Sequence, residues 1–285
     1  MRYYLHGEGA KPDWEVTTFQ TGSNTWHRYV TWPPKEVKQT NLYLHADGTL
    51  SFAPDVPAGP QYRQYVSDPA NPVPYRVRPI SPTYPEPDWG TWEVADQRFV
   101  DHRPDVLSFE SAPLDHNVTI TGSITAALYA STSGTDSDFV VKLIDAYPEK
   151  DQKSADDITP AKPGGYTDSL NGYELPIAME VRRGRFLHRN DHPEPLTANK
   201  PKKWDIPLRD HDHVFLKGHR IMVQVQSTWF PVIDRNPQKF VPSIYEATAA
   251  DFVPAKQRIY CTPQMPSRIV LPIVSDEGAP QPPQA

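Results

Sequence analysis

The clearest hydrophobic pattern of the chain lies in residues 138–148. In this run Phe139, Val141 and Leu143 alternate with a second set of mostly aliphatic positions, which is the period of a β-strand. A small polar turn at residues 131–137 precedes the run, and a proline ends it. The pattern therefore predicts a buried strand with a turn at one end and a proline at the other.

Shorter alternating runs recur along the chain and are separated by turn-forming residues. Residues 14–19 and 25–29 flank one such turn, and residues 41–44 and 49–52 flank an Ala-Asp-Gly turn, so both pairs predict β-hairpins. Further strands are predicted at residues 61–66, 106–110, 118–130, 203–208, 213–215, 220–227, 257–260 and 269–273. Many short strands with almost no helical periodicity predict an all-β fold, namely an antiparallel jelly-roll β-sandwich.

The chain is predicted to contain one β-sandwich domain, at residues 14–274, between two short terminal segments. Residues 1–13 are interpreted as the remnant of a helix from a preceding domain, with Gly7 at its C-cap. Residues 275–285 are acidic and then rich in proline and glutamine, which predicts a disordered tail.

Proline is the outlier of the composition, with 33 of 285 residues, more than twice the average share of roughly 5%. Because proline cannot donate in a strand ladder and breaks helices, this content favours strands joined by stiff loops. Residues 68–92 form a long irregular stretch, and residues 149–173 predict a polar, mobile insert. The net charge of −6 does not favour nucleic acid or a membrane surface as a partner, and no apolar run has the length of a membrane helix.

The residue types that carry catalysis or metal binding form no complete motif. The G-x-S-x-G turn of serine hydrolases is absent, and the serines at residues 122–123 and 131–134 lie beside predicted strands. His211 and His213 form a His-x-His pair, but no third ligand follows at metal-site spacing, so no metal and no other cofactor is predicted. Cys261 is the single cysteine and is interpreted as a buried thiol.

Two longer runs carry a resemblance to a known family. Residues 138–148 and residues 215–231, the latter followed by Asp-Arg-Asn-Pro-Gln at residues 234–238, resemble the C-terminal β-sandwich of the CocE/NonD serine hydrolases. That family includes α-amino acid ester hydrolases, glutaryl-7-aminocephalosporanic acid acylases, cocaine esterase and X-Pro dipeptidyl peptidases. The resemblance implies a galactose-binding-like jelly roll and a periplasmic or secreted location. Since the family's nucleophile, acid and base precede the matched segment, it implies no catalytic residue here.

Individual residues are assigned by the same resemblance and by local pattern. Arg103 and Asp105, within Arg-Pro-Asp, predict a partly buried ion pair that holds a loop. The residues assigned to structural motifs are Arg103, Asp105, Asp138, Lys142, Asp145, Trp229 and Asp234. The candidates for the edge of a substrate pocket or a domain interface are Tyr84, Trp89, Trp92 and Arg235. For the three aromatic residues, cover of the core ranks first, a pocket edge second and a sugar-binding platform third.

Three functional hypotheses follow. In the first, the chain is the C-terminal accessory domain of a serine ester or amide hydrolase, inactive alone. Its partner is then an α/β-hydrolase catalytic domain in cis, and homo-oligomer contacts are a second candidate. In the alternative, the chain is a free-standing jelly-roll module that binds carbohydrate or another small ligand. In the third, it is a hydrolase with a novel site, which a serine-directed fluorophosphonate would label.

Overall fold

The structure is a computed structural model that describes residues 2–54, 61–79, 87–149 and 170–274. The strands are β1 (Val16–Gln20), β2 (Thr25–Tyr29), β3 (Val37–Leu44), β4 (Thr49–Ser51), β5 (Tyr62–Ser67), β6 (Leu107–Ser111), β7 (Val118–Thr132), β8 (Asp138–Ala146), β9 (Glu174–Arg183), β10 (Lys202–Phe215), β11 (Arg220–Gln226), β12 (Ala255–Thr262), β13 (Met265–Pro266) and β14 (Arg268–Val274). The helical segments are α1 (Arg2–His6), η1 (Pro87–Val94), α2 (Arg98–Asp101), η2 (Gly184–Phe186), η3 (Ile244–Glu246) and η4 (Ala249–Asp251). None of these described helices has the length and apolar character needed to span a membrane. Tyr84, the tail predicted at residues 275–285 and most of the insert predicted at residues 149–173 lie outside the described residues.

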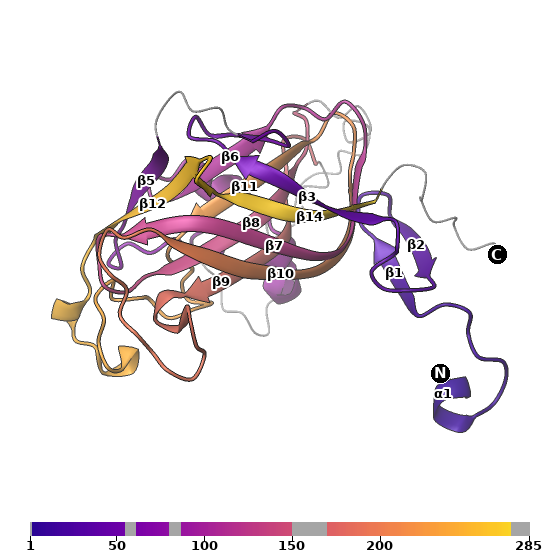
Figure 1. Ribbon diagram of the computed structural model, residues 1–285, viewed down its shortest axis with the longest axis horizontal. Coiled ribbons are helices and arrows are strands. Elements are labelled where there is room, and N and C mark those ends of the chain that lie inside the picture. The colour runs from indigo at the N-terminus through magenta and orange to yellow at the C-terminus, as the bar shows by residue number, and fades with distance from the viewer. Residues whose placement is uncertain (1, 55–60, 80–86, 150–169, 275–285) are drawn as a thin grey trace.

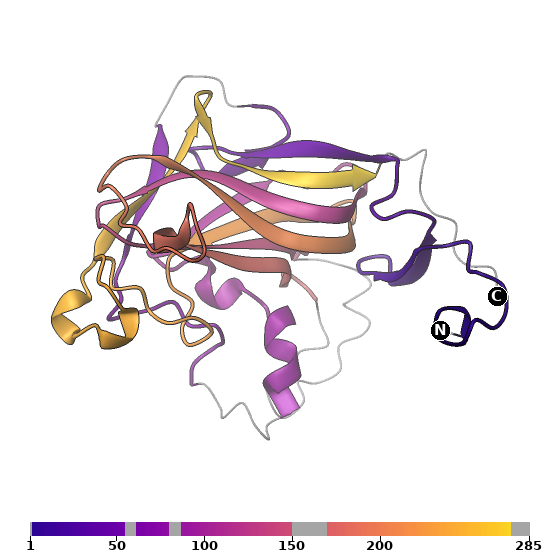
Figure 2. The same ribbon diagram turned by 60° about the horizontal axis from the view of Figure 1, so that its bottom comes forward.

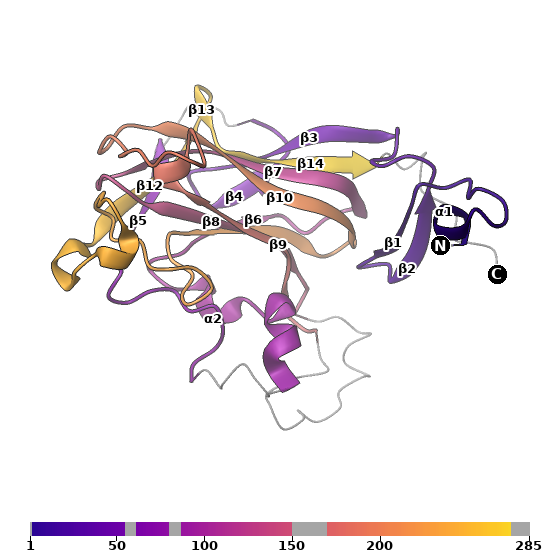
Figure 3. The same ribbon diagram turned by 90° about the horizontal axis from the view of Figure 1, so that it is seen from below.

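Hydrogen bonds join twelve strands into one sheet, in the order β13-β12-β7-β14-β3-β4-β6-β11-β8-β9, with β10 beside β7 and β5 beside β12. The ladders are antiparallel except the short one between β4 and β6. The sheet folds over on itself, so that β7, β10 and β14 lie in one layer and β6, β8 and β11 in the other (Figure 1 and Figure 3). The all-β sandwich is confirmed, and the jelly-roll connectivity stays a prediction.

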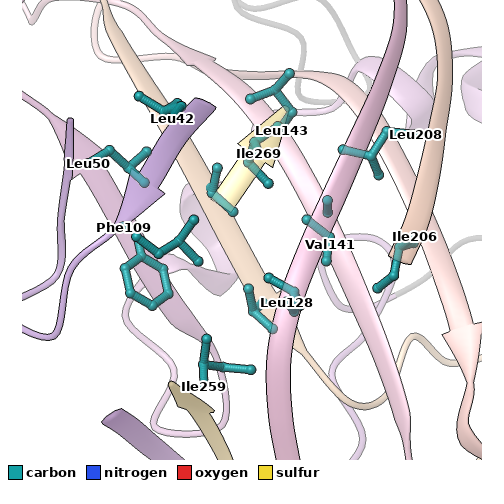
Figure 4. Packing of buried hydrophobic residues seen from close by; sticks show 14 of the residues in the cluster. Leu42, Leu50, Phe109, Leu128, Val141, Leu143, Ile206, Leu208, Ile259 and Ile269 are labelled. Carbon is teal, nitrogen blue, oxygen red and sulfur yellow. The ribbon is translucent and has the colours of Figure 1, made fainter. Parts of the chain in front are cut away.

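The hydrophobic core fills the space between these two layers (Figure 4). Leu128 of β7, Ile206 of β10 and Ile269 of β14 belong to one buried cluster with Phe109 of β6 and Val141 of β8. Each fully buried side chain of this kind stabilises the fold by about 1.5–3 kcal/mol. The face of residues 138–148 predicted to be buried therefore lies in the main core.

β8 is also covered on its other face. All nine of its residues are buried, and the strand lies between β9 and β11 in the sheet. On the outer face, Val140 packs with Tyr75 and Trp229, which come from loops far away in the sequence. Figure 2 and Figure 3 show η1 and α2 on this side of the sheet. Because water cannot reach either face, every polar side chain of β8 requires a protein partner.

The structure differs from the predicted strands at β9 and β10. The sequence pattern does not predict β9, because it is a half-buried edge strand with a proline and several charged residues, so its alternation is weak. The pattern predicts two strands where β10 is continuous. The ladder of β10 with β7 shifts register between Pro207 and Asp210, where Arg209 has a φ of 67°. The extra residue of this bulge interrupts the period-two pattern.

The β1–β2 hairpin forms a separate two-stranded sheet at one end of the sandwich (Figure 1). Its inner face is held by the carboxylate of Asp212 on β10. That carboxylate accepts hydrogen bonds from Thr18 at 2.5 Å, Gln20 at 2.8 Å and Tyr29 at 2.9 Å, and from Thr121 of β7 at 3.1 Å. Burial and the charge of Asp212 raise the pKa of Tyr29, so its hydroxyl stays a donor.

The turn of this hairpin lies directly against the backbone of β10. The N–H of Thr21 donates to the carbonyl of Asp212 at 3.1 Å, and the N–H of Val214 donates to the carbonyl of Thr21 at 2.9 Å. Gly22 follows with a φ of +87°, and a Cβ there would lie 2.1 Å from the carbonyl oxygen of Val214. Only glycine fits at this position, for steric as well as conformational reasons.

We expect Gly22→Ala to release the hairpin from β10, and Gly218→Ala serves as the matched control. Gly218 has nearly the same φ, +88°, but a Cβ added there would have no atom within 4 Å. Both variants carry the left-handed penalty of about 1–2 kcal/mol, and only Gly22→Ala adds the clash. Amide hydrogen exchange of β1 and β2 should accelerate in Gly22→Ala alone, and equal exchange in the two variants would contradict the proposed close packing.

Candidate functional site

Lys142 lies in the middle of the outer face of β8 and is 0% exposed. Its Nζ donates to Oε1 of Gln97, which is 2.6 Å away in the turn between η1 and α2. The backbone N–H of Gln97 donates to the carbonyl of Glu174, the first residue of β9, at 3.1 Å. These two hydrogen bonds fasten the η1–α2 segment to the sheet.

Two titratable groups of this region have strongly shifted pKa values. Burial lowers the pKa of Lys142 to about 7, although the Glu174 carboxylate acts in the opposite direction. Burial, with smaller contributions from Asp101 and Asp96, raises the pKa of Glu174 to about 8. The Glu174 carboxylate also accepts a hydrogen bond from the Gln224 amide at 3.2 Å. Both groups thus change protonation near neutral pH, a property common at active sites but also produced by burial alone.

Glu174 borders an open cleft of about 890 Å³. Two arginines on its wall are engaged within the domain, since Arg98 lies 2.5 Å from Asp96 and Arg220 lies 3.7 Å from Glu110. The described residues that line the cleft include no serine, threonine, cysteine or lysine. An acyl-transfer reaction needs such a nucleophile beside a base, so the described lining does not supply one.

Tyr75, Trp92 and Trp229 form an aromatic cover over β8. Their rings are in T-shaped contact, with centroids 5.5 Å apart for Tyr75 and Trp92 and 5.8 Å apart for Trp92 and Trp229. Nζ of Lys142 lies 6.0 Å from the Trp229 ring, a cation–π arrangement. Trp92 is half-buried in this cluster, which favours its interpretation as cover of the sheet over a sugar platform. The backbone of Trp89 lies in the same helix, η1.

The ion pair predicted from Arg-Pro-Asp is confirmed. Nε and Nη2 of Arg103 each donate to one carboxylate oxygen of Asp105 at 2.8 Å, a bidentate geometry. Nη2 of Arg103 also lies 3.4 Å from the carbonyl of Asn71. The pair therefore ties the start of β6 to the irregular stretch that follows β5.

Two buried carboxylates lie at the start of β8. Nε of Arg185 donates to Asp136 at 2.8 Å, and the Arg183 guanidinium lies 3.2 Å from Asp138. The Asn236 amide donates to Asp138 at 2.9 Å, and its oxygen accepts from the backbone N–H two residues later at 2.8 Å. Burial raises the pKa of Asp138 to about 7, although Arg183 acts in the opposite direction. These contacts connect β8, η2 and the turn at residues 234–238.

Asp145, near the end of β8, lies between two histidines. Its carboxylate is 2.9 Å from Nδ1 of His219 and 3.3 Å from Nε2 of His213. The other ring nitrogen of His213 contacts the hydroxyl of Thr21 at 2.8 Å, while His211 contacts the backbone carbonyl three residues before it at 2.9 Å. The two rings of the His-x-His pair thus have separate partners. The described residues contain no group of three or more His, Cys, Asp or Glu side chains able to hold a metal ion.

Two hydroxyl groups contact histidines in a way that the sequence did not indicate. The hydroxyl of Thr21 contacts His213, whose other ring nitrogen faces Asp145. The hydroxyl of Ser51 lies 2.8 Å from Nε2 of His45. The nucleophile of an α/β-hydrolase lies on a sharp strand-to-helix turn beside backbone N–H groups that bind the oxyanion. Thr21 lies instead in the turn of a hairpin, and Ser51 ends β4. Both contacts therefore connect neighbouring segments of the fold.

Arg235 and Asp234 make contacts within the domain. Nη1 of Arg235 donates to the carbonyl of Pro69 at 2.9 Å, and its guanidinium lies over the rings of Phe230 and Phe252, at 5.7 and 5.0 Å. The carbonyl of Asp234 accepts from Arg183 at 3.0 Å. A further role of Arg235 at a domain interface stays a prediction.

Sequence reasoning missed Gln97, Glu174 and Asp212. Gln97 lies in a stretch without periodicity, and Glu174 begins the strand that the pattern does not predict. Asp212 stands out in the sequence only as a neighbour of the histidine pair, although it binds four side chains. Their partners are between 45 and 194 residues away in the chain, so no local pattern could have identified them.

We expect Glu174→Gln to flatten the pH dependence of stability between pH 5 and pH 8. The folded-state pKa of Glu174, about 8, is above its ordinary value, so the folded state binds more protons across this range and stability falls as the pH rises. The loss amounts to at most about 1.4 kcal/mol per pH unit. Urea unfolding at a series of pH values measures it, with Glu246→Gln on the exposed η3 as control. Parallel profiles for the wild type and Glu174→Gln would contradict the assignment.

Comparisons with known proteins match nearly the whole chain. The family described as X-Pro dipeptidyl-peptidase C-terminal non-catalytic domain matches residues 6–270. An α-amino acid ester hydrolase structure is 43% identical, with a TM-score of 0.86, over 95% of this chain and 43% of that chain. An aminopeptidase from the marine sediment archaeon Thaumarchaeota archaeon is 42% identical, with a TM-score of 0.84, over 96% of this chain and 43% of that chain. The cocaine esterase of Rhodococcus sp. (strain MB1 Bresler) is 29% identical over 267 residues, 91% of this chain and 42% of the esterase.

The chain thus spans less than half the length of each of these relatives, 42–43%. The resemblance seen in residues 138–148 and 215–231 is confirmed, since both runs lie within the matched range. The charged side chains of β8 have their polar partners inside the domain, which agrees with the description of the family as non-catalytic. The chain belongs to the family of X-Pro dipeptidyl-peptidase C-terminal non-catalytic domains, which occur in CocE/NonD-family hydrolases.

Proposed function

We propose that this chain is the accessory domain of a serine ester or amide hydrolase and braces a catalytic α/β-hydrolase domain of the same polypeptide. The observation that carries the proposal is the 43% identity to an α-amino acid ester hydrolase over 95% of this chain but only 43% of that protein. The remainder of such a protein holds more than half of its residues, enough for a catalytic domain. In this proposal residues 14–274 are the accessory sandwich, residues 1–13 belong to the helix before it, and residues 275–285 are a tail.

The charged groups of β8 support a bracing role rather than a chemical one. Lys142 is bound to Gln97, Asp138 to Asn236 and Asp145 to His219, all of them inside the domain. A catalytic group must touch a substrate, whereas these groups stabilise the contacts between distant segments. They make the sandwich a rigid support for the loops on its surface.

The same proposal assigns η1 to the edge of the substrate pocket. η1 carries Trp89 and Trp92, and it is followed by Gln97, which Lys142 holds against the sheet. Trp92 is fixed by its contact with Trp229. A short helix held in this way presents side chains in a constant position, as a pocket wall requires.

A chimaera tests the proposal. This chain replaces the matching C-terminal domain of the α-amino acid ester hydrolase, and the reference is that hydrolase without any such domain. We expect the chimaera to be soluble and to hydrolyse an α-amino acid ester, while the shortened hydrolase aggregates or loses most of its activity. A chimaera no better than the shortened enzyme, or a shortened enzyme that is fully active, would refute the bracing role.

A further inference from the structure

The β1–β2 hairpin has two faces of opposite character. Its inner face is bound to Asp212, whereas its outer face carries Phe19 and Trp26, which are 43% and 56% exposed and in T-shaped contact at 5.4 Å. On the same face, the Arg28 guanidinium lies 4.2 Å from the ring of Trp14. We call Trp14, Phe19, Trp26 and Arg28 the hairpin strip.

A cleft of about 370 Å³ extends the apolar surface of the strip. Its apolar lining comes from Phe19 and Trp32, from Val94 of η1, and from Leu175 and Ile177 of β9. Its polar lining comes from the hairpin and β10, at Thr18, Thr21 and residues 210–212. The cleft thus connects the hairpin to η1, the helix assigned above to the pocket edge. Its apolar lining residues offer contacts to apolar side chains of a partner.

The hairpin that carries the exposed strip is held firmly against the sandwich. A two-stranded hairpin alone is marginally stable, but here Asp212 and the close approach of Gly22 hold it against β10. Aromatic residues and arginine are enriched in the cores of protein interfaces, and a contiguous exposed aromatic surface marks such a site. Tyr245 offers a comparison, since it is 86% exposed on η3 at the opposite end of the molecule.

We infer that the hairpin strip and its cleft are the surface on which the catalytic α/β-hydrolase domain docks. The inference rests on the proposed function and adds the place of contact. The matched family is a C-terminal domain, so in a full-length relative the catalytic domain precedes it in the chain and is joined to its N-terminal end. α1 and the hairpin lie together at that end of the molecule (Figure 1), and Tyr4 and Leu5 of α1 are exposed as well. The docking domain therefore meets exposed apolar side chains on both segments.

Hydroxyl-radical footprinting tests the place of contact without relying on activity. The oxidation of Trp26 is compared between the isolated chain and the chimaera with the α-amino acid ester hydrolase, with Tyr245 as the internal control. We expect Trp26 to be oxidised roughly fivefold more slowly in the chimaera, because an interface core excludes water, and Tyr245 to be unchanged. Equal oxidation of Trp26 in both proteins would overturn the inference. Protection of Trp26 in a dimer of the isolated chain would assign the surface to a second copy instead.

Paired variants separate this inference from the proposed function. Phe19→Ser with Trp26→Ser removes the two exposed rings of the strip, and Tyr245→Ser removes one exposed ring elsewhere. Both variants should leave the Tm of the isolated chain unchanged, since these side chains point outward. In the chimaera, only the double variant should lower the Tm of the catalytic part, by about 5 °C or more. An active chimaera that tolerates the double variant refutes the docking surface alone, whereas an inactive unmodified chimaera refutes the proposed function and the inference with it.

Discussion

The burial of β8 on both faces is the constraint on which the rest of this structure depends. The strand carries Asp138, Lys142 and Asp145, and an unpaired charge in such a position costs several kcal/mol. Each of these side chains has its partner on a different segment: the 234–238 turn, the η1–α2 segment and the turn before β11. The strand can therefore reach its place only when those segments are also in place, so burial couples the sheet to its covering loops.

The hairpin at the N-terminal end shows the same principle with a single carboxylate. Asp212 accepts four side-chain hydrogen bonds, from both strands of the hairpin and from β7. A two-stranded ribbon has too little apolar surface to hold itself in one position. A buried acceptor with several donors fixes its orientation, and the opposite face of the ribbon is left free to present Phe19 and Trp26.

The shifted pKa values of Lys142 and Glu174 have a structural cause in a domain of a non-catalytic family. Desolvation is the largest cause of both shifts. The hydrogen-bond partner of Lys142 is Gln97 and that of Glu174 is Gln224, and both partners are structural residues of the domain. Active sites also use desolvation to tune acids and bases, so a shifted pKa by itself does not distinguish the two cases. The distinction here comes from contacts: Lys142 is fully buried and bound to Gln97, and the described lining of the cleft beside Glu174 includes no serine, threonine, cysteine or lysine.

The sequence by itself determined the all-β class, the strongest strands, the Arg103–Asp105 pair and the family, because alternation, a two-residue spacing and a motif are local properties. Only the tertiary structure decided that β9 exists as an edge strand and that Glu174 and Gln97 meet beside Lys142. It also decided which aromatic residues are covered, since Trp92 packs on Trp229 while Phe19 and Trp26 face outward. Alternation indicates that a strand has two faces, but what covers each face depends on segments that are remote in the chain and meet only when the protein folds.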